Sequence, residues 1–149
     1  MADMQAEALG DLPNWDLDDL YPGRDSDALK GDLSRIETEA NGFRDRYRGT
    51  LAALDGAGLG EAIAVYEALQ DTMGRIMSFA QLAYSGNVTD PEVGKFYQTM
   101  QERVTTISSE LIFFTLELNE LDDDVLNAKL SDPAAAKYAP WLRDVRAFR

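Results

Sequence analysis

Four glutamates on two predicted helices are the first residues whose types and spacing could do chemistry. Glu102, Glu110 and Glu117 recur along one helical segment, and Glu67 lies on the preceding one. Facing carboxylates in helical bundles hold two metal ions when Glu-x-x-His motifs complete the site, and this chain has no His. We therefore interpret these glutamates as a solvated face.

Three further patterns have chemical and structural interpretations. Asp122–Asp124 lacks the alternating order of a calcium loop and predicts the charged first turn of a helix. Gly56–Gly60 follows no strand and lacks the G-x-G-x-x-G spacing, so it predicts a loop rather than a phosphate site. The hydroxyls of Thr105, Thr106, Ser108 and Ser109 lie within a helix, where such groups bond back to carbonyls or let helices approach. Nothing singles out two carboxylates for glycosidase chemistry.

His and Cys are both absent from the 149 residues. Their absence excludes Ser-His-Asp and Cys-His nucleophiles, His-rich metal sites, thiolate sites and disulfides. We therefore assign no catalytic, cofactor-binding or metal-binding residue, and we expect no cofactor in this chain.

The charge balance of 14 basic to 27 acidic residues, a net charge of −13, disfavours nucleic acid as a partner. No apolar run approaches the roughly 20 residues of a membrane span, and residues 1–7 lack the features of a signal peptide. We expect a cytoplasmic protein with no nucleic-acid or membrane partner.

Apolar periodicity predicts an all-α fold, an antiparallel bundle of three long helices followed by shorter helices. The length suits one domain. We expect residues 1–11 to form a disordered acidic tail and residues 12–149 a helical domain, in which Leu12–Tyr21 is an ordered arm packed on the body. No strand alternation or internal repeat is found.

The first long helix is predicted to begin at the cap residues Asp25–Asp27 and to end near Arg48, with Gly49 left-handed. The second carries an apolar stripe from Leu59 to Tyr84, and Gly74 within it indicates a close neighbouring helix.

The third long helix has Asp90 as its N-cap and Pro91 as its first residue, and its stripe runs unbroken to Leu118, a rod of about 40 Å. Beyond it, one short helix ends before Asp132-Pro133. Another begins at Pro140 and continues to Arg149 without a C-cap, so the chain is expected to stop within a helix.

Phe113 and Phe114 are adjacent on a helix, so their side chains point about 100° apart. One of them is expected to contact something outside the three-helix core.

Five phrases in order are similar to the N-terminal portion of oligoendopeptidase F, a zinc metallopeptidase family related to thimet oligopeptidase. The resemblance spans the chain from about Leu12 to Arg149. The five phrases are Trp15–Pro22, Tyr47–Gly49, Tyr66–Leu69, Phe113–Asn119 and Tyr138–Arg143. The resemblance implies a cytoplasmic, mostly helical enzyme that hydrolyses oligopeptides, whose N-terminal helices form one wall of a deep substrate cleft.

The family's zinc is held in a later domain by a His-Glu-x-x-His helix and a further Glu. Because this chain has no His, no zinc-binding or catalytic position is carried over. We expect a segment truncated before the catalytic domain and inactive alone, whose partners are oligopeptides and that domain. With that domain absent, we expect self-association near Phe113, Trp141 and Phe148.

Two other functions stay open at this point. A stand-alone helical interaction module would bind a partner helix or peptide in an apolar groove. A small enzyme that uses only carboxylates is the third possibility.

Overall fold

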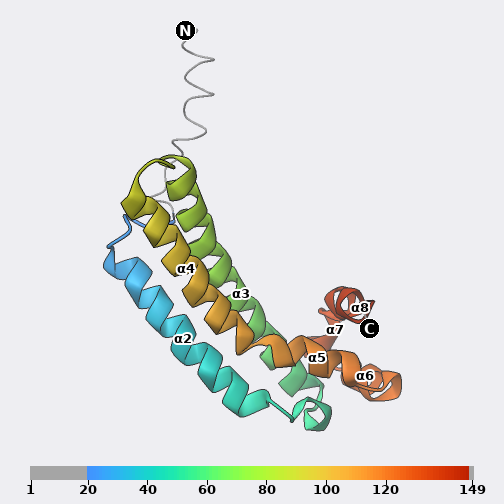
Figure 1. Ribbon diagram of the computed structural model, residues 1–149. Helices are drawn as coiled ribbons and strands as arrows, with labels where there is room; N and C mark the ends of the chain where they lie inside the picture. The colour runs from blue at the N-terminus through green and yellow to red at the C-terminus, as the bar shows by residue number, and fades with distance from the viewer. Residues whose placement is uncertain (1–19, 148–149) are drawn as a thin grey trace. The chain divides into compact units, whose positions relative to one another are not determined.

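A computed structural model describes residues 20–147, and within them every regular element is a helix (Figure 1). The elements are α2 (Asp27–Tyr47), η2 (Leu51–Ala53), α3 (Gly56–Ser85), α4 (Pro91–Ser109), α5 (Ile112–Glu120), α6 (Asp123–Lys129), α7 (Pro133–Ala136) and α8 (Ala139–Arg146). The all-α prediction is confirmed. The antiparallel arrangement of three long helices stays a prediction.

The described residues form two compact units, the first from 20–36 with 71–106 and the second from 37–70 with 107–147. Helices α2, α3 and α4 each contribute residues to both units. The predicted tail 1–11, and the predicted arm as far as residue 19, lie outside the described residues.

The predicted helix starts follow local capping chemistry. The Ser26 hydroxyl accepts a hydrogen bond from the Leu29 amide at 3.1 Å as α2 begins, and the Asp90 carboxylate accepts one from the Glu92 amide at 2.9 Å beside Pro91. After α2, Gly49 has φ of 81°, the left-handed conformation predicted for it. These predictions are confirmed.

The predicted continuous helix from Pro91 to Leu118 is wrong, because α4 ends at Ser109 and α5 begins at Ile112. Between them the amides of Glu110 and Leu111 donate to carbonyls three residues back, at 3.1 and 2.9 Å. This tighter turn leaves the apolar stripe buried on both sides of the break. The stripe therefore gives no sequence signal of the interruption.

The predicted loop Gly56–Gly60 is also wrong, since α3 begins at Gly56 and the Asp55 carboxylate accepts a hydrogen bond from the Gly58 amide at 2.7 Å. A Cβ at Gly56 would lie 2.3 Å from the Lys129 carbonyl oxygen, and one at Gly60 would lie 2.3 Å from that of Ala134. The glycines let the backbone of residues 129–134 approach α3. The close neighbour predicted at Gly74 is not found among residues 20–147, where a Cβ at this position meets nothing within 4 Å.

The last described elements differ from expectation in two ways. Helix α7 is not predicted from the sequence, and it is capped by Asp132, whose carboxylate accepts a hydrogen bond from the Ala134 amide at 2.8 Å. Helix α8 ends at Arg146, whereas the sequence predicted a helix as far as Arg149.

Tyr21 is buried in the first unit, in keeping with the packing predicted for the end of the arm. Its ring lies edge-on to Phe79 at 5.5 Å, and Phe79 meets Phe96 in the same way at 6.1 Å. The Tyr21 hydroxyl donates to the Asp32 carboxylate at 2.7 Å. The ring of Tyr21 is thus packed against apolar neighbours while its hydroxyl keeps a hydrogen bond.

Gly60→Ala is expected to lower the free energy of unfolding by about 1–3 kcal/mol, because its methyl group would overlap backbone atoms of Ala134. Gly74→Ala is the matched control on α3, and it is expected to raise stability by about 0.5–1 kcal/mol because the site is open. Urea unfolding followed by circular dichroism measures both. Equal effects of the two substitutions would contradict the close approach.

Alkaline pH is expected to destabilise the protein partly through Tyr21. Burial raises the pKa of its hydroxyl above the ordinary value near 10.0, and the hydrogen bond to Asp32 raises it further. The unfolded chain therefore releases this proton at lower pH than the folded chain, so stability is lost as pH rises above about 10. The free energy of unfolding should fall less steeply above pH 10 in Tyr21→Phe than in the original protein. Parallel pH curves would contradict this.

Candidate functional site

Five aromatic rings pack together in the second unit, and we call them the aromatic cluster: Phe43, Tyr66, Phe113, Phe114 and Trp141. The fully buried Phe114 is central, with ring centroids at 4.8 Å from Tyr66, 5.1 Å from Phe43 and 6.5 Å from Trp141. Tyr66 also contacts Trp141 at 5.8 Å. The cluster joins segments of α2, α3, α5 and α8.

Phe114 makes the contact outside the three long helices that was expected of one of these two residues, with its ring 6.5 Å from that of Trp141 on α8, whereas Phe113 is half-buried with its ring 5.7 Å from that of Phe43. The exposed apolar side chains of α5 are instead Ile112 and Leu116, which are 54% and 55% exposed and one turn apart. Trp141 belongs to the cluster, and Phe148 lies outside the described residues. Self-association stays a prediction.

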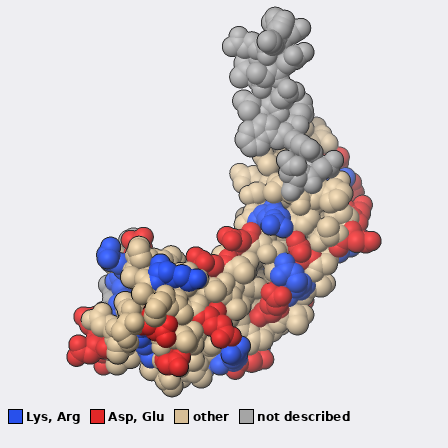
Figure 2. Space-filling model, turned by 180° about the vertical axis from the view of Figure 1, so that it is seen from behind, with Lys and Arg blue, Asp and Glu red and all other residues tan. Residues whose placement is uncertain are grey.

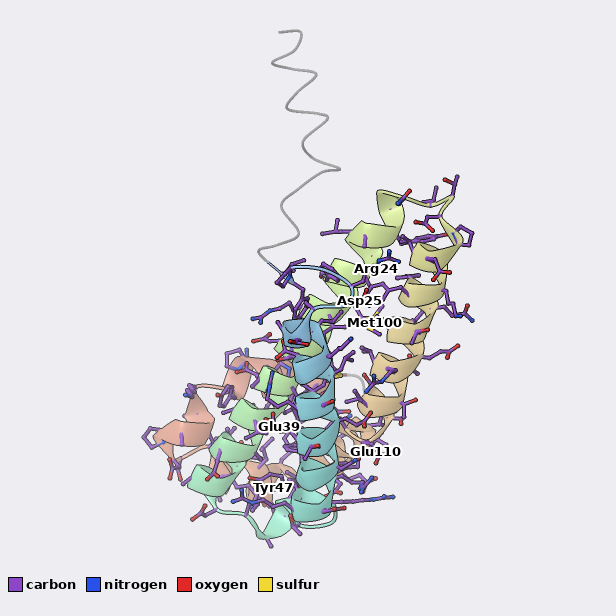
Figure 3. All side chains as sticks on the ribbon, turned by 90° about the vertical axis from the view of Figure 1, so that its left-hand side faces the viewer. Arg24, Asp25, Glu39, Tyr47, Met100 and Glu110 are labelled. Atoms are coloured by element: carbon purple, nitrogen blue, oxygen red, sulfur yellow. The ribbon has the colours of Figure 1, made fainter. Side chains whose placement is uncertain are left out.

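The glutamates considered as metal ligands make structural contacts. Glu110, labelled in Figure 3, forms an ion pair with Arg44, and the hydrogen bond between them raises the pKa of Arg44. Glu117 accepts a hydrogen bond from the Gly49 amide at 2.7 Å, and Glu102 accepts one from Gln98 at 3.4 Å.

Glu67, the remaining glutamate of that group, is exposed. Within residues 20–147, no group of three or more Asp or Glu side chains is placed to hold a metal ion. Among the helical hydroxyls, Thr106 donates to the Glu102 carbonyl at 3.0 Å, the back-bonding expected for such a residue.

Lys129 is a buried cation that the sequence does not single out. Its side chain donates to the carbonyl of Ala52 at 2.9 Å and also to that of Leu54. These carbonyls lie in η2 and directly after it, so Lys129 ties the end of α6 to the segment before α3. The ammonium group satisfies backbone oxygens that would otherwise lose hydration.

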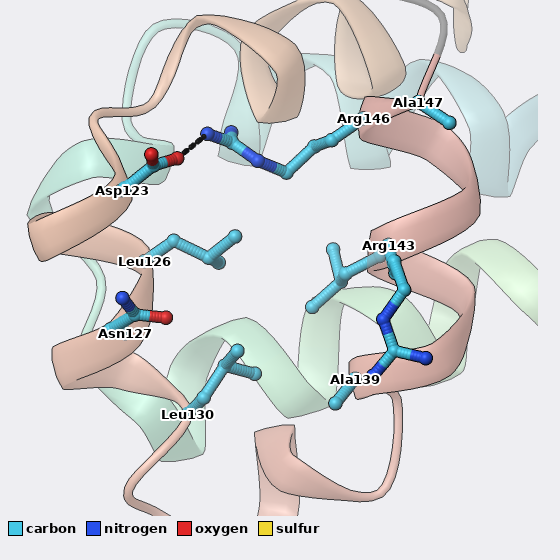
Figure 4. Close-up of a pocket in the computed structure, with 9 residues that line it drawn as sticks. Asp123, Leu126, Asn127, Leu130, Ala139, Arg143, Arg146 and Ala147 are labelled. Atoms are coloured by element: carbon cyan, nitrogen blue, oxygen red, sulfur yellow. Dashed lines mark hydrogen bonds and ion pairs between the residues drawn. The ribbon is translucent and has the colours of Figure 1, made fainter.

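A hollow of about 520 Å³ lies between α6 and α8, wholly within the second unit, and we call it the α6–α8 pocket (Figure 4). It is lined by Asp123, Leu126, Asn127, Leu130, Ala139, Leu142, Arg143, Arg146 and Ala147. Leu126 and Leu142 are only 5% and 1% exposed. They provide a firmly packed apolar surface.

Arg146 crosses one side of the α6–α8 pocket. Its guanidinium donates to the Leu118 carbonyl near the end of α5 at 2.6 Å. It also donates to the Asp123 carboxylate at 2.6 Å, the contact marked by the dashed line in Figure 4. The Arg146 side chain is only 10% exposed, whereas that of Asp123 is 79% exposed. This arginine has a structural role, because it connects α8 to both α5 and α6.

Two other hollows occur in the described residues. One of about 490 Å³ lies beside α2 and is lined by Glu39, Gly42, Phe43, Arg46, Tyr47, Val65 and Ala68 (Figure 3). Burial raises the pKa of Tyr47, and its hydroxyl has no hydrogen-bond partner among the described residues. The other hollow, of about 290 Å³, lies in the first unit and is lined by charged groups that include Arg24, Asp25 and Lys95.

The surface carries both charge signs. Figure 2 shows acidic and basic side chains interspersed over the visible face, without a continuous basic stripe. None of the helices in the described part of the chain is long and apolar enough to cross a membrane.

No family model, curated protein or solved structure matches the chain. The site must therefore be interpreted from its own chemistry. The residues of the α6–α8 pocket combine an apolar floor with polar and charged groups, which is the usual composition of a ligand site. No sequence motif marks these residues as a site. The one sequence feature that could have indicated the site is the pair Arg143 and Arg146, three residues apart on the predicted short helix that carries Leu142.

Arg146→Met is expected to lower the free energy of unfolding by about 2 kcal/mol, chiefly because the Leu118 carbonyl loses a charged donor. The exposed Asp123 contributes little of this, since water screens its charge. Arg143→Met, the matched control one turn away, is expected to change stability by no more than about 0.5 kcal/mol. Thermal and urea unfolding measure both variants. A neutral Arg146→Met would contradict the role of this arginine.

Proposed function

We propose that this chain is the N-terminal helical part of a cytoplasmic zinc metalloendopeptidase of the oligoendopeptidase F type. In this proposal the helices form one wall of the cleft that admits oligopeptides. The zinc and the general base belong to a later part of the parent protein, because this chain contains no His. The chain contributes shape and contact surface, and the chemistry takes place elsewhere.

The observation that carries the proposal is that sequence segments similar to oligoendopeptidase F contact one another in the second unit. Tyr66 of the third phrase contacts Phe114 of the fourth at 4.8 Å and Trp141 of the fifth at 5.8 Å. Gly49 of the second phrase donates its amide to Glu117 of the fourth at 2.7 Å. Phrases scattered along the sequence thus supply residues to one packed region. Such contacts support the view that the similarity to the family reflects a similar packing of these helices.

The first phrase contributes less to this argument. Its residues Trp15–Asp19 lie outside the described part of the chain, and its Tyr21 is buried in the first unit. The support therefore comes from the four phrases between Tyr47 and Arg143.

The purified 149-residue chain is expected to bind zinc at far below one ion per molecule and to leave a quenched fluorescent oligopeptide uncut. Elemental analysis after dialysis and a fluorescence assay with added zinc measure the two properties. Stoichiometric, tightly held zinc or zinc-dependent cleavage would contradict the proposal.

The genomic reading frame distinguishes the proposal from its alternative. A frame that continues beyond Arg149 and encodes a His-Glu-x-x-His helix supports the peptidase. A stop codon directly after Arg149 would overturn it and favour the stand-alone interaction module.

A further inference from the structure

We propose that the α6–α8 pocket binds a small monocarboxylate with an apolar tail. The tail lies on the leucine floor and the carboxylate is held by Arg143, with Asn127 on the opposite side. The proposal rests on the pocket's own residues and does not depend on the family assignment.

The apolar part of the pocket fits an aliphatic tail. Leu126 and Leu130 line it from α6 and from the residue after that helix, and Leu142 lines it from α8. The volume of about 520 Å³ lies within the range of small-molecule sites, roughly 300–1,000 Å³. Because both walls belong to the second unit, the pocket is complete within it.

The polar part of the pocket has two groups that no described residue engages. The Arg143 guanidinium makes no hydrogen bond or ion pair with a described residue, in contrast to that of Arg146, which donates to Leu118 and Asp123. Asn127 lines the pocket from α6, across from α8, and its side-chain amide also has no hydrogen bond to a described residue (Figure 4). A guanidinium fork is the side chain best matched to a carboxylate, so Arg143 is the group that would hold the ligand's charge.

The charge of the lining favours a singly charged anion. Two guanidinium groups and one carboxylate line the pocket, an excess of one positive charge in a chain with 27 acidic and 14 basic residues. Asp123 is already paired with Arg146, so Arg143 supplies the excess charge. A dianion such as phosphate would meet the Asp123 carboxylate and would leave the apolar floor unused. The complementary ligand is therefore a monocarboxylate with a hydrocarbon tail.

Two kinds of molecule carry a carboxylate beside an apolar group: a free aliphatic acid and the C-terminal residue of a peptide. Octanoate represents the first and N-acetyl-leucine the second. Their uncharged counterparts, 1-octanol and N-acetyl-leucinamide, retain the apolar part and lack the carboxylate. Each probe is titrated into the 149-residue protein, with binding followed by calorimetry and by amide chemical-shift changes.

At least one carboxylate probe is expected to bind saturably and to shift amides of α6 and α8, and its uncharged counterpart should bind about tenfold more weakly. Arg143→Met should weaken the carboxylate about tenfold. Lys137→Met is the matched control, because it also removes one positive charge, near α8 but outside the pocket lining. It should leave binding unchanged. Preference for octanoate identifies a free acid as the ligand type, and preference for N-acetyl-leucine identifies a peptide end.

Three results would overturn the proposal: neither carboxylate binds, the uncharged counterparts bind equally well, or Arg143→Met and Lys137→Met weaken binding to the same extent. Circular dichroism of each variant establishes that it is folded. Because Arg143 is exposed and has no partner among the described residues, its substitution should not disturb the helices.

Discussion

The packing of aromatic rings around Phe114 is the interaction on which the second unit depends. Phe114 is fully buried, and its neighbours come from segments well separated in the chain, Phe43 on α2, Tyr66 on α3 and Trp141 on α8. Burial of such rings supplies both a large apolar area and a preferred geometry. The cluster therefore holds the short helices α5 and α8 against α2 and α3, where helix propensity alone would leave them marginal.

Polar side chains add hydrogen bonds to the packing of the rings, because each short helix leaves backbone groups without partners within the helix. Lys129 donates to carbonyls of Ala52 and Leu54, and Arg146 donates to the Leu118 carbonyl. Gly56 and Gly60 allow the backbone around α7 to approach α3. Two residues of α8 fix its position: Trp141 packs on Tyr66, and Arg146 donates to Asp123. The α6–α8 pocket results because these contacts leave the face of α8 toward α6 partly uncovered.

The proposed functions make different uses of the same unit. In the peptidase proposal, the aromatic cluster is a packing pattern that supports a cleft wall and performs no chemistry. The pocket proposal concerns a surface beside that cluster, where Arg143 and Asn127 have no partner among the described residues. The two are therefore independent, and a ligand in the pocket would add a binding role to a structural domain.

The sequence by itself determined the helical character, the starts of α2 and α4 and the left-handed Gly49, because caps, proline and apolar period act locally. It did not determine the break before α5, since the buried stripe has the same spacing on both sides of the turn. Nor did it identify the glycines of α3 as packing positions, because that role depends on a backbone segment distant in sequence. The pocket was missed for the same reason. Only the tertiary structure decided that Arg146 is held by Leu118 and Asp123, whereas the side chain of Arg143 has no partner among the described residues.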